Sequence, residues 1–199
     1  MIKNKFYLIF TFFIINTFYA MSQKYETQEY KVIENINEVE LRYYPSAPMI
    51  KVSDNYNRNN NFGKLFRYIT GSNIENEKIA MTTPVYMYND NKTMEFVLPK
   101  KYIKDQIPEP NDKNVEVYIS KPKFFAAIQF SGYSNEKKIE KNKTILQNIL
   151  KENDIEIISD FYLLVYDAPT KFYNRRNEIL FEIKKNNWNQ ISISQKRLY

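Results

Sequence analysis

Apolar and polar residues alternate along several short segments of the chain, the pattern of strands that bury one face. Val39, Leu41 and Tyr43 alternate with Glu40 and Arg42 in the clearest example. Pro45 and Pro48 then interrupt the alternation, and a further strand follows. On this pattern we predict strands at residues 30–33, 39–43, 49–53, 83–88, 93–98, 115–120, 124–131, 161–166 and 178–183.

One segment between these strands instead has apolar residues at helical spacing. Phe62, Leu65, Phe66 and Ile69 fall at positions i, i+3, i+4 and i+7, which places them on one face of an α-helix. Gly71 follows where a helix commonly ends, because glycine adopts the left-handed cap conformation without strain. The pattern therefore predicts a first amphipathic helix that ends near Gly71.

A second helix is predicted within residues 134–154. Ser134 is its expected N-cap, and Glu136 in the first turn complements the positive end of the helix dipole. Residues 89–91 read Asn-Asp-Asn and predict a hairpin turn. The apolar face of this helix comprises Ile139, Leu146, Ile149 and Leu150.

The order strand, helix, strand, strand occurs twice, although the two halves share negligible sequence identity. Two such units most simply join into one curved antiparallel sheet with both helices packed outside it. The chain has 199 residues, of which 43% are hydrophobic, so one domain with a sizeable core is expected. The predicted class is α+β, with two pseudo-symmetric β-α-β-β repeats.

The composition excludes several kinds of chemistry. The chain contains no Cys and no His, so disulfides, zinc–thiolate sites, Cys nucleophiles, Ser-His-Asp triads and His ligands to haem iron are impossible. It contains only three Gly, and neither a P-loop nor a GxGxxG motif occurs. Carboxylates, Lys, Arg, Tyr, Met and hydroxyls remain as candidate functional groups.

The first residues have the three-part pattern of a secretory signal. Lys3 and Lys5 precede an apolar run, and Ala20 and Ser22 supply small residues for a cut after Ser22. We therefore expect residues 1–22 to be removed, leaving one domain at 23–199 that is periplasmic or extracellular. Loss of two lysines lowers the net charge from +6 to about +4. Because acidic residues are interspersed with the basic ones, a nucleic-acid partner is not expected.

Several segments together point to a known family. The chain resembles the SOUL haem-binding family in "YKVIENINEVELRYYPS", "FGKLFRYITGSN", "KIAMTTPVYMY", "MEFVLPKKY", "FFAAIQFSGY" and "YDAPTKFYNRRNEILFEI", in this order. The resemblance implies a distorted antiparallel β-barrel of two β-α-β-β units. It also implies binding of haem or another tetrapyrrole, held non-covalently in a shallow, largely apolar cleft beside the first helix. Separately, we expect a monomer that is a binding protein and not an enzyme.

The resemblance carries over to individual residues. Phe62 and Phe66 match the apolar positions of the first helix, Arg67 matches a cation near the porphyrin, and Lys171 matches a second cation. Apolar side chains suit a flat porphyrin, and Arg or Lys suits its propionates. The same helical residues could instead be core, and the cations could be ordinary surface charges. The predicted ligand-binding set is Phe62, Leu65, Phe66, Arg67, Ile69, Met81, Lys171 and Arg175.

The absence of His is a departure from family members that use a His axial ligand, so iron would need Tyr, Met, solvent or no protein ligand. Two alternatives remain. The first is an effector-type domain that binds another small apolar ligand. The second is an enzyme that uses a carboxylate such as Glu95 or Glu178 beside Tyr, with a pKa raised by burial.

The run Arg175-Arg176-Asn177-Glu178 is unusual, because four polar residues lead directly into an apolar strand pattern. We interpret Asn177 and Glu178 mainly as residues that fix the exit of a loop into the sheet, through backbone hydrogen bonds and pairing with an Arg. Arg175 or Arg176 could also face the anionic edge of a ligand.

Overall fold

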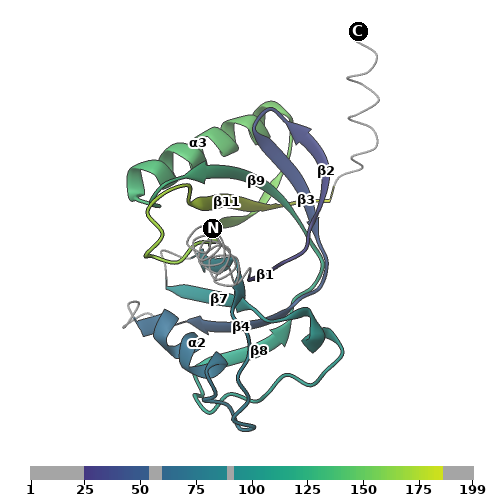
Figure 1. Ribbon diagram of the computed structural model, residues 1–199. Coiled ribbons are helices and arrows are strands. Elements are labelled where there is room, and N and C mark those ends of the chain that lie inside the picture. The colour runs from purple at the N-terminus through teal and green to yellow at the C-terminus, as the bar shows by residue number, and fades with distance from the viewer. Residues whose placement is uncertain (1–24, 54–59, 89–91, 186–199) are drawn as a thin grey trace, which may run out of the picture.

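Nine antiparallel strands form one curved sheet, and two helices lie on its outer side (Figure 1). The computed structural model describes residues 25–53, 60–88 and 92–185. The predicted α+β class is therefore confirmed. The elements are β1 (Glu26–Thr27), β2 (Lys31–Ile36), β3 (Val39–Tyr44), β4 (Pro48–Ser53), α2 (Asn61–Ile69), β5 (Thr82–Thr83), β6 (Val85–Tyr88), β7 (Thr93–Val97), η2 (Lys100–Ile103), β8 (Val115–Ile119), β9 (Lys123–Ser131), α3 (Glu136–Glu152), β10 (Ile157–Val165) and β11 (Arg176–Ile183).

The strand order shows the two repeats directly. It reads β2-β3-β9-β11-β10-β6-β7-β4-β8, so β9, β11 and β10 mirror β4, β7 and β6 about a pseudo-twofold axis between β10 and β6. The first repeat is β4-α2-β6-β7 and the second is β9-α3-β10-β11. Each repeat also pairs with the strand that precedes the other repeat, because β3 adjoins β9 and β8 adjoins β4. These exchanged strands join the halves into one sheet.

The sheet does not close into the expected barrel. Within the described residues, β2 pairs only with β3 and β8 pairs only with β4, which leaves both as edges. The expectation of a barrel was therefore wrong, although curvature was predicted correctly. The side chains of β2 are exposed or half-buried along its whole length, so it offers no continuous apolar face with which closure could be stabilised.

Each helix covers an apolar core on the outer face of its own repeat. Under α2, Leu65, Tyr68 and Ile69 pack against Ile50 and Phe96 of the sheet. Under α3, the core contains Leu146, Ile149 and Leu150, with the sheet residues Val39, Leu41, Ala126, Ile128, Phe130, Leu163, Ile179, Phe181 and Ile183. The apolar face predicted for α3 is confirmed, whereas on α2 only Leu65 and Ile69 of the predicted face are buried, because Phe62 and Phe66 are each 44% exposed.

The predicted C-terminal cap of α2 is observed, whereas the N-cap of α3 differs from the predicted residue. Gly71 has φ +115°, and the amides of Gly71 and Ser72 donate to the carbonyls of Tyr68 and Arg67, which forms a Schellman cap. The predicted N-cap at Ser134 was wrong by one residue, because the side chain of Asn135 accepts from the Lys138 amide. The predicted hairpin turn at 89–91 lies outside the described residues.

Among the described residues, neither α2 nor α3 contributes to the inner face of the sheet, which carries a buried charge network. Glu178 on β11 is fully buried, and its carboxylate accepts five hydrogen bonds. Arg42 reaches it from β3 at 2.8 and 3.1 Å, Arg176 from β11 at 2.7 and 3.0 Å, and the Tyr166 hydroxyl at 2.9 Å. Because β9 lies between β3 and β11, this network ties strands that share no backbone pairing.

The polar run at the start of β11 is thereby explained. Asn177 donates to the Gly132 carbonyl at 2.7 Å, and Asp167 accepts from the Arg176 amide at 2.6 Å. The interpretation of Asn177 and Glu178 as residues that fix the loop exit is confirmed. Glu178 does more than this, since it also links the strand to Arg42 at the far side of β9.

We predict that Glu178→Gln lowers the free energy of unfolding by about 3 kcal/mol or more, because it removes the buried acidic partner that Arg42 and Arg176 share and leaves Arg42 only the more exposed Glu40. Urea denaturation of the protein measures this change. The matched control is Glu182→Gln on the same strand. Glu182 pairs with Lys123 at 2.6 Å in a half-exposed position, so its loss should cost no more than about 1 kcal/mol.

The same comparison depends on pH. The guanidinium groups of Arg42 and Arg176 outweigh the effect of burial and hold the pKa of Glu178 below its usual value. The ionised carboxylate therefore contributes stability above the unfolded-state pKa, and the contribution disappears as pH falls through the folded-state pKa. The difference between wild type and Glu178→Gln should shrink in that acidic range. A difference that is small at neutral pH, or independent of pH, would contradict a stabilising role.

Candidate functional site

Two phenylalanines on α2 form an exposed aromatic surface beside the core. Phe62 and Phe66 are each 44% exposed, and their rings stack with centroids 5.7 Å apart and planes 15° apart. Phe62 also meets the buried ring of Phe96 edge-on, at 5.3 Å. The core holds this pair in place while it leaves the outer ring faces accessible, so the surface is suited to a flat apolar ligand.

Gly63 has no side chain, so the outer surface of α2 is flat next to this aromatic pair. A Cβ atom on Gly63 would lie 2.9 Å from the Asn60 side-chain oxygen and 3.5 Å from Nη1 of Arg67. The guanidinium of the exposed Arg67 therefore lies back over the glycine, along the helix. The close contact is with Asn60, whereas the guanidinium would lie at ordinary contact distance from a side chain at this position.

A cleft of about 230 Å³ lies on the other side of Arg67, between α2 and the segment before β8. Asp112 on its wall has a pKa below the usual value, mainly because the Asn114 amide donates to it and also because Lys64 and Arg67 are near. The cleft therefore joins basic side chains of α2 to one acidic side chain. Its lining is Lys64, Arg67, Tyr68, Ser72, Pro110, Asn111, Asp112 and Val115.

The remaining predicted apolar residues lie beneath this surface. Leu65 and Ile69 are buried in the core under α2, and Met81 is half-buried against the same core. They support Phe62 and Phe66 from below and do not form the exposed surface. Their direct contact with a ligand stays a prediction.

The two predicted cations after β10 belong to a different, tightly bonded loop. Lys171 pairs with Asp167 at 2.6 Å. Arg175 is 5% exposed, and its guanidinium donates to the carbonyls of Ala168 and Lys171 at 2.7 Å and of Asp167 at 3.3 Å. It also lies 4.8 Å from the centre of the Tyr133 ring. Within the described chain, none of these polar contacts joins the loop to α2, and a shared role of the loop and the helix in ligand binding stays a prediction.

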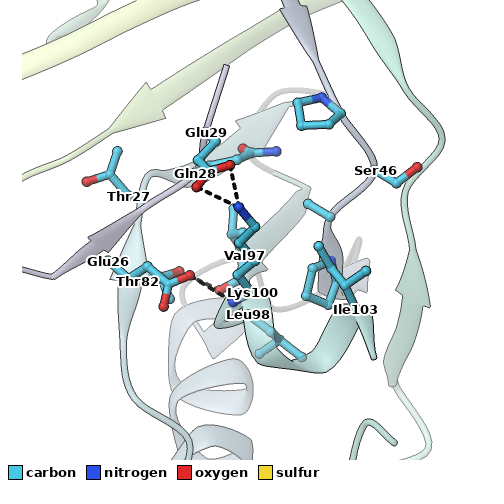
Figure 2. A pocket seen from close by; sticks show the side chains of 13 residues that line it. Glu26, Thr27, Gln28, Glu29, Ser46, Thr82, Val97, Leu98, Lys100 and Ile103 are labelled. Atoms are coloured by element: carbon cyan, nitrogen blue, oxygen red, sulfur yellow. Dashed lines mark hydrogen bonds and ion pairs between the residues drawn. The ribbon is translucent and has the colours of Figure 1, made fainter. Parts of the chain in front are cut away.

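Figure 2 shows a cavity of about 190 Å³ under the N-terminal strand, which the sequence did not predict. Its walls are mostly apolar, from Pro45, Ala47, Pro48, Val97, Leu98 and Ile103. The N-terminal segment closes it, because Lys100 bonds Glu26 through its amide and Glu29 through its ammonium, each within 2.8 Å. These contacts are between distant segments, so no local sequence signal could have shown them.

A further cavity of about 200 Å³ opens on the inner face of the sheet. Glu95 lies in its wall and accepts hydrogen bonds from Tyr88 at 3.0 Å and Tyr118 at 2.8 Å. Burial raises the pKa of Glu95, although the two tyrosine hydroxyls oppose this effect. The sequence suggested a carboxylate beside Tyr, and the alternation of Tyr86 with Tyr88 was the available signal. The register of the strands was needed to gather the residues.

No cluster of three or more acidic, His or Cys side chains is arranged to bind a metal ion within 25–53, 60–88 and 92–185. None of the helices in this part of the chain combines the length and hydropathy needed to cross a bilayer.

Comparison with known proteins gives one family. The family model described as SOUL heme-binding protein matches residues 25–182 of this chain. Heme-binding protein 1 of Xenopus laevis is 32% identical over 133 residues, which cover 62% of this chain and 68% of that protein. Heme-binding protein 2 of Homo sapiens is 28% identical over 188 residues, which cover 84% and 90%. The matched range contains both repeats.

Two solved structures share the fold at low identity. A hydrolase from Listeria innocua superposes with a TM-score of 0.53 and 7% identity, over 76% of this chain and 94% of that chain. EcmrR in its DNA complex, from a structure of EcmrR-RPo, has a TM-score of 0.54 and 13% identity, over 74% and 57%. At such identities the likeness concerns the fold alone.

We predict that Arg175→Met lowers the free energy of unfolding by about 2–3 kcal/mol, because three backbone carbonyls lose a charged donor. Amide exchange across residues 167–176 should accelerate at the same time. Lys171→Met is the control from the same loop, since its half-exposed ion pair should contribute at most about 1 kcal/mol. Equal effects of the two variants would show that Arg175 does not hold the loop.

Proposed function

The chain belongs to the SOUL heme-binding protein family, and on that premise we propose that it is an exported protein that binds haem or a related tetrapyrrole non-covalently. The observation that carries the proposal is the exposed, stacked pair Phe62 and Phe66 on α2, with Arg67 beside it. The relatives are named as heme-binding proteins, which supports a binding function over catalysis.

The residues on α2 suit the shape and charge of a porphyrin. One face of the disc would lie on Phe62 and Phe66, where aromatic contact and loss of water stabilise it. The low surface at Gly63 lets the disc approach the helix, and Arg67 is within reach of its edge to pair with a propionate. Lys64 lies on the adjacent cleft wall and adds positive charge there.

The site is shallow. The cavities of about 190, 200 and 230 Å³ are each smaller than the roughly 300–1,000 Å³ of typical enclosed ligand pockets. A tetrapyrrole would therefore lie on the surface of α2 with one face in solvent. Such a site suits a carrier or scavenger that must release its ligand more than an enzyme that must exclude water.

The side chains of this surface would offer no ligand to the iron of a bound haem. Bound haem would supply a redox-active iron centre, whose properties depend on its axial ligands. The chain has no His and no Cys, and Phe62, Phe66 and Arg67 cannot coordinate iron. Recognition then depends on the porphyrin and its propionates, so iron-free protoporphyrin should bind about as well as hemin.

An effector-type function is the second candidate, and the inner-face cavity around Glu95 favours it. Glu178, the other carboxylate considered for catalysis, is a poor candidate because its oxygens already accept five hydrogen bonds. The proposed binding function does not require either carboxylate.

Export is a part of the proposal that depends on residues 1–22, which lie outside the described residues. We predict that expression of the full chain in a bacterium with a general secretory pathway yields a product that begins at Gln23. Intact-mass measurement and N-terminal sequencing of the exported fraction test this. Recovery of the uncut chain in the cytosol would contradict export.

We predict that the mature chain shifts the Soret band of hemin saturably, and that Phe62→Ala/Phe66→Ala weakens binding at least about tenfold, or ~1.4 kcal/mol. The matched control is Val32→Ala/Ile33→Ala, which removes two exposed apolar side chains on β2, at the other end of the sheet. Equal affinities of the two double variants would place the ligand elsewhere.

A charge test separates the propionates from the disc. Arg67→Ala should weaken binding of hemin and leave binding of protoporphyrin dimethyl ester nearly unchanged, because the ester has no carboxylate. An equal loss for both ligands would mean that Arg67 acts only through packing. An unshifted Soret band for the unaltered chain would overturn the proposed function.

A further inference from the structure

The two buried glutamates of the inner face have opposite surroundings. Glu178 has two arginine partners, whereas Glu95 is 7% exposed and forms no ion pair with any described residue. Both hydrogen bonds to Glu95, from Tyr88 and Tyr118, end on Oε1. Among the described residues, Oε2 accepts no hydrogen bond, and Glu95 lines the cavity of about 200 Å³.

Aromatic rings surround this carboxylate. Tyr162 lies at the centre of the wall, with ring centroids 4.9 Å from Tyr88, 5.6 Å from Phe125 and 6.3 Å from Tyr86. These side chains come from β6, β9 and β10 and share one face of the sheet with Glu95 on β7. Rings of this kind attract cations through their negative faces and also bury apolar groups.

The charges of Lys51 and Lys123 lower the pKa of Glu95 but do not outweigh its burial, and neither lysine forms an ion pair with it among the described residues. Lys51 pairs with Glu116 at 2.9 Å, and Lys123 pairs with Glu182 at 2.6 Å. Each ammonium lies at the edge of the aromatic wall, 5.4 Å from the Tyr118 ring centre and 5.9 Å from that of Tyr162. The charges of Lys51 and Lys123 therefore already have acidic partners near the rim, whereas the third lysine of the lining, Lys121, is exposed to solvent.

A buried carboxylate without a cation is costly to the fold. Its burial raises the pKa of Glu95, whereas the arginines lower that of Glu178. The fold thus stabilises one glutamate and leaves the other one partly unsatisfied at the wall of a cavity. An unsatisfied group of this kind, where a ligand can reach it, is typical of a binding site.

We propose that the inner-face cavity is a second binding site, which takes a small organic ammonium with a compact apolar or aromatic body. The ammonium donates to Oε2 of Glu95, and the body lies among Tyr86, Tyr88, Tyr118 and Tyr162. The volume admits a small monoamine and excludes a tetrapyrrole.

This site is separate from the surface proposed for haem. Consecutive residues of a strand face opposite sides, so Glu95 faces the inner cavity while Phe96 faces the core under α2 and contacts Phe62. The two sites therefore lie on opposite faces of β7 and can be tested independently.

Three probes of one shape and different charge test the proposal: benzylamine, benzyl alcohol and benzoate. Each is titrated into the mature chain at neutral pH and followed through the tyrosine ring signals by NMR. Benzylamine should bind at least about tenfold more tightly than benzyl alcohol, and Glu95→Gln should remove that preference. Equal binding of amine and alcohol, tighter binding of benzoate, or no response to benzylamine would overturn the proposal.

The controls separate binding from folding. Glu156→Gln makes the same charge change at an exposed pair with Lys184 and should leave the benzylamine preference intact. Glu95→Gln should keep or raise the thermal midpoint at neutral pH, because it replaces a carboxylate whose ionised form burial disfavours. Hemin binding by Glu95→Gln should be unchanged, so failure at either site is distinguishable from failure at the other.

Discussion

The buried contact between Arg42 and Glu178 is the interaction on which the inner face depends. It spans β9, since Arg42 belongs to β3 and Glu178 to β11, and Arg176 and Tyr166 complete the shell around the carboxylate. Backbone pairing fixes only neighbouring strands. A charge network across an intervening strand therefore adds a constraint on curvature that the ladder alone does not provide. The network is costly to bury, and it is tolerated because every charge in it has a close partner.

Side chains of each strand alternate between the outer and inner faces of the sheet, and the two faces have different roles. On the outer face, α2 and α3 each cover an apolar core, and these cores hold the two repeats together. On the inner face, the side chains are rich in tyrosine and charge, and neither of the described helices α2 and α3 covers them (Figure 1). Adjacent residues of β7 belong to different regions, because Phe96 supports the aromatic surface of α2 while Glu95 lines the inner cavity. A single strand thus supports both candidate sites.

Local sequence signals predicted the elements well, since hydrophobic periodicity and the cap at Gly71 report short-range physics. They also identified the polar run at the start of β11 as residues that fix the position of this strand. They failed where distant segments meet. An open sheet and a closed barrel have the same strand patterns, and only the exposed edge strand β2 distinguishes them. Likewise, Lys171 and Arg175 are residue types expected at the rim of a ligand site, but both side chains form hydrogen bonds within their own loop. Prediction of the cavity around Glu95 would have required the registers of β4, β6, β7 and β10, because these bring its lining residues together.

The two buried glutamates show how a chain without His or Cys can still build specific sites. Glu178 receives every hydrogen bond that its carboxylate can use well, so its charge serves the fold. Glu95 receives two from tyrosines on one oxygen and leaves the other for a ligand. The same residue type therefore serves stability at one position and recognition at the other, and the difference is the distance to an arginine. A protein that has neither metal-binding thiolates nor imidazoles must recognise ligands through shape, aromatic faces and unpaired charge, and this sheet provides all three.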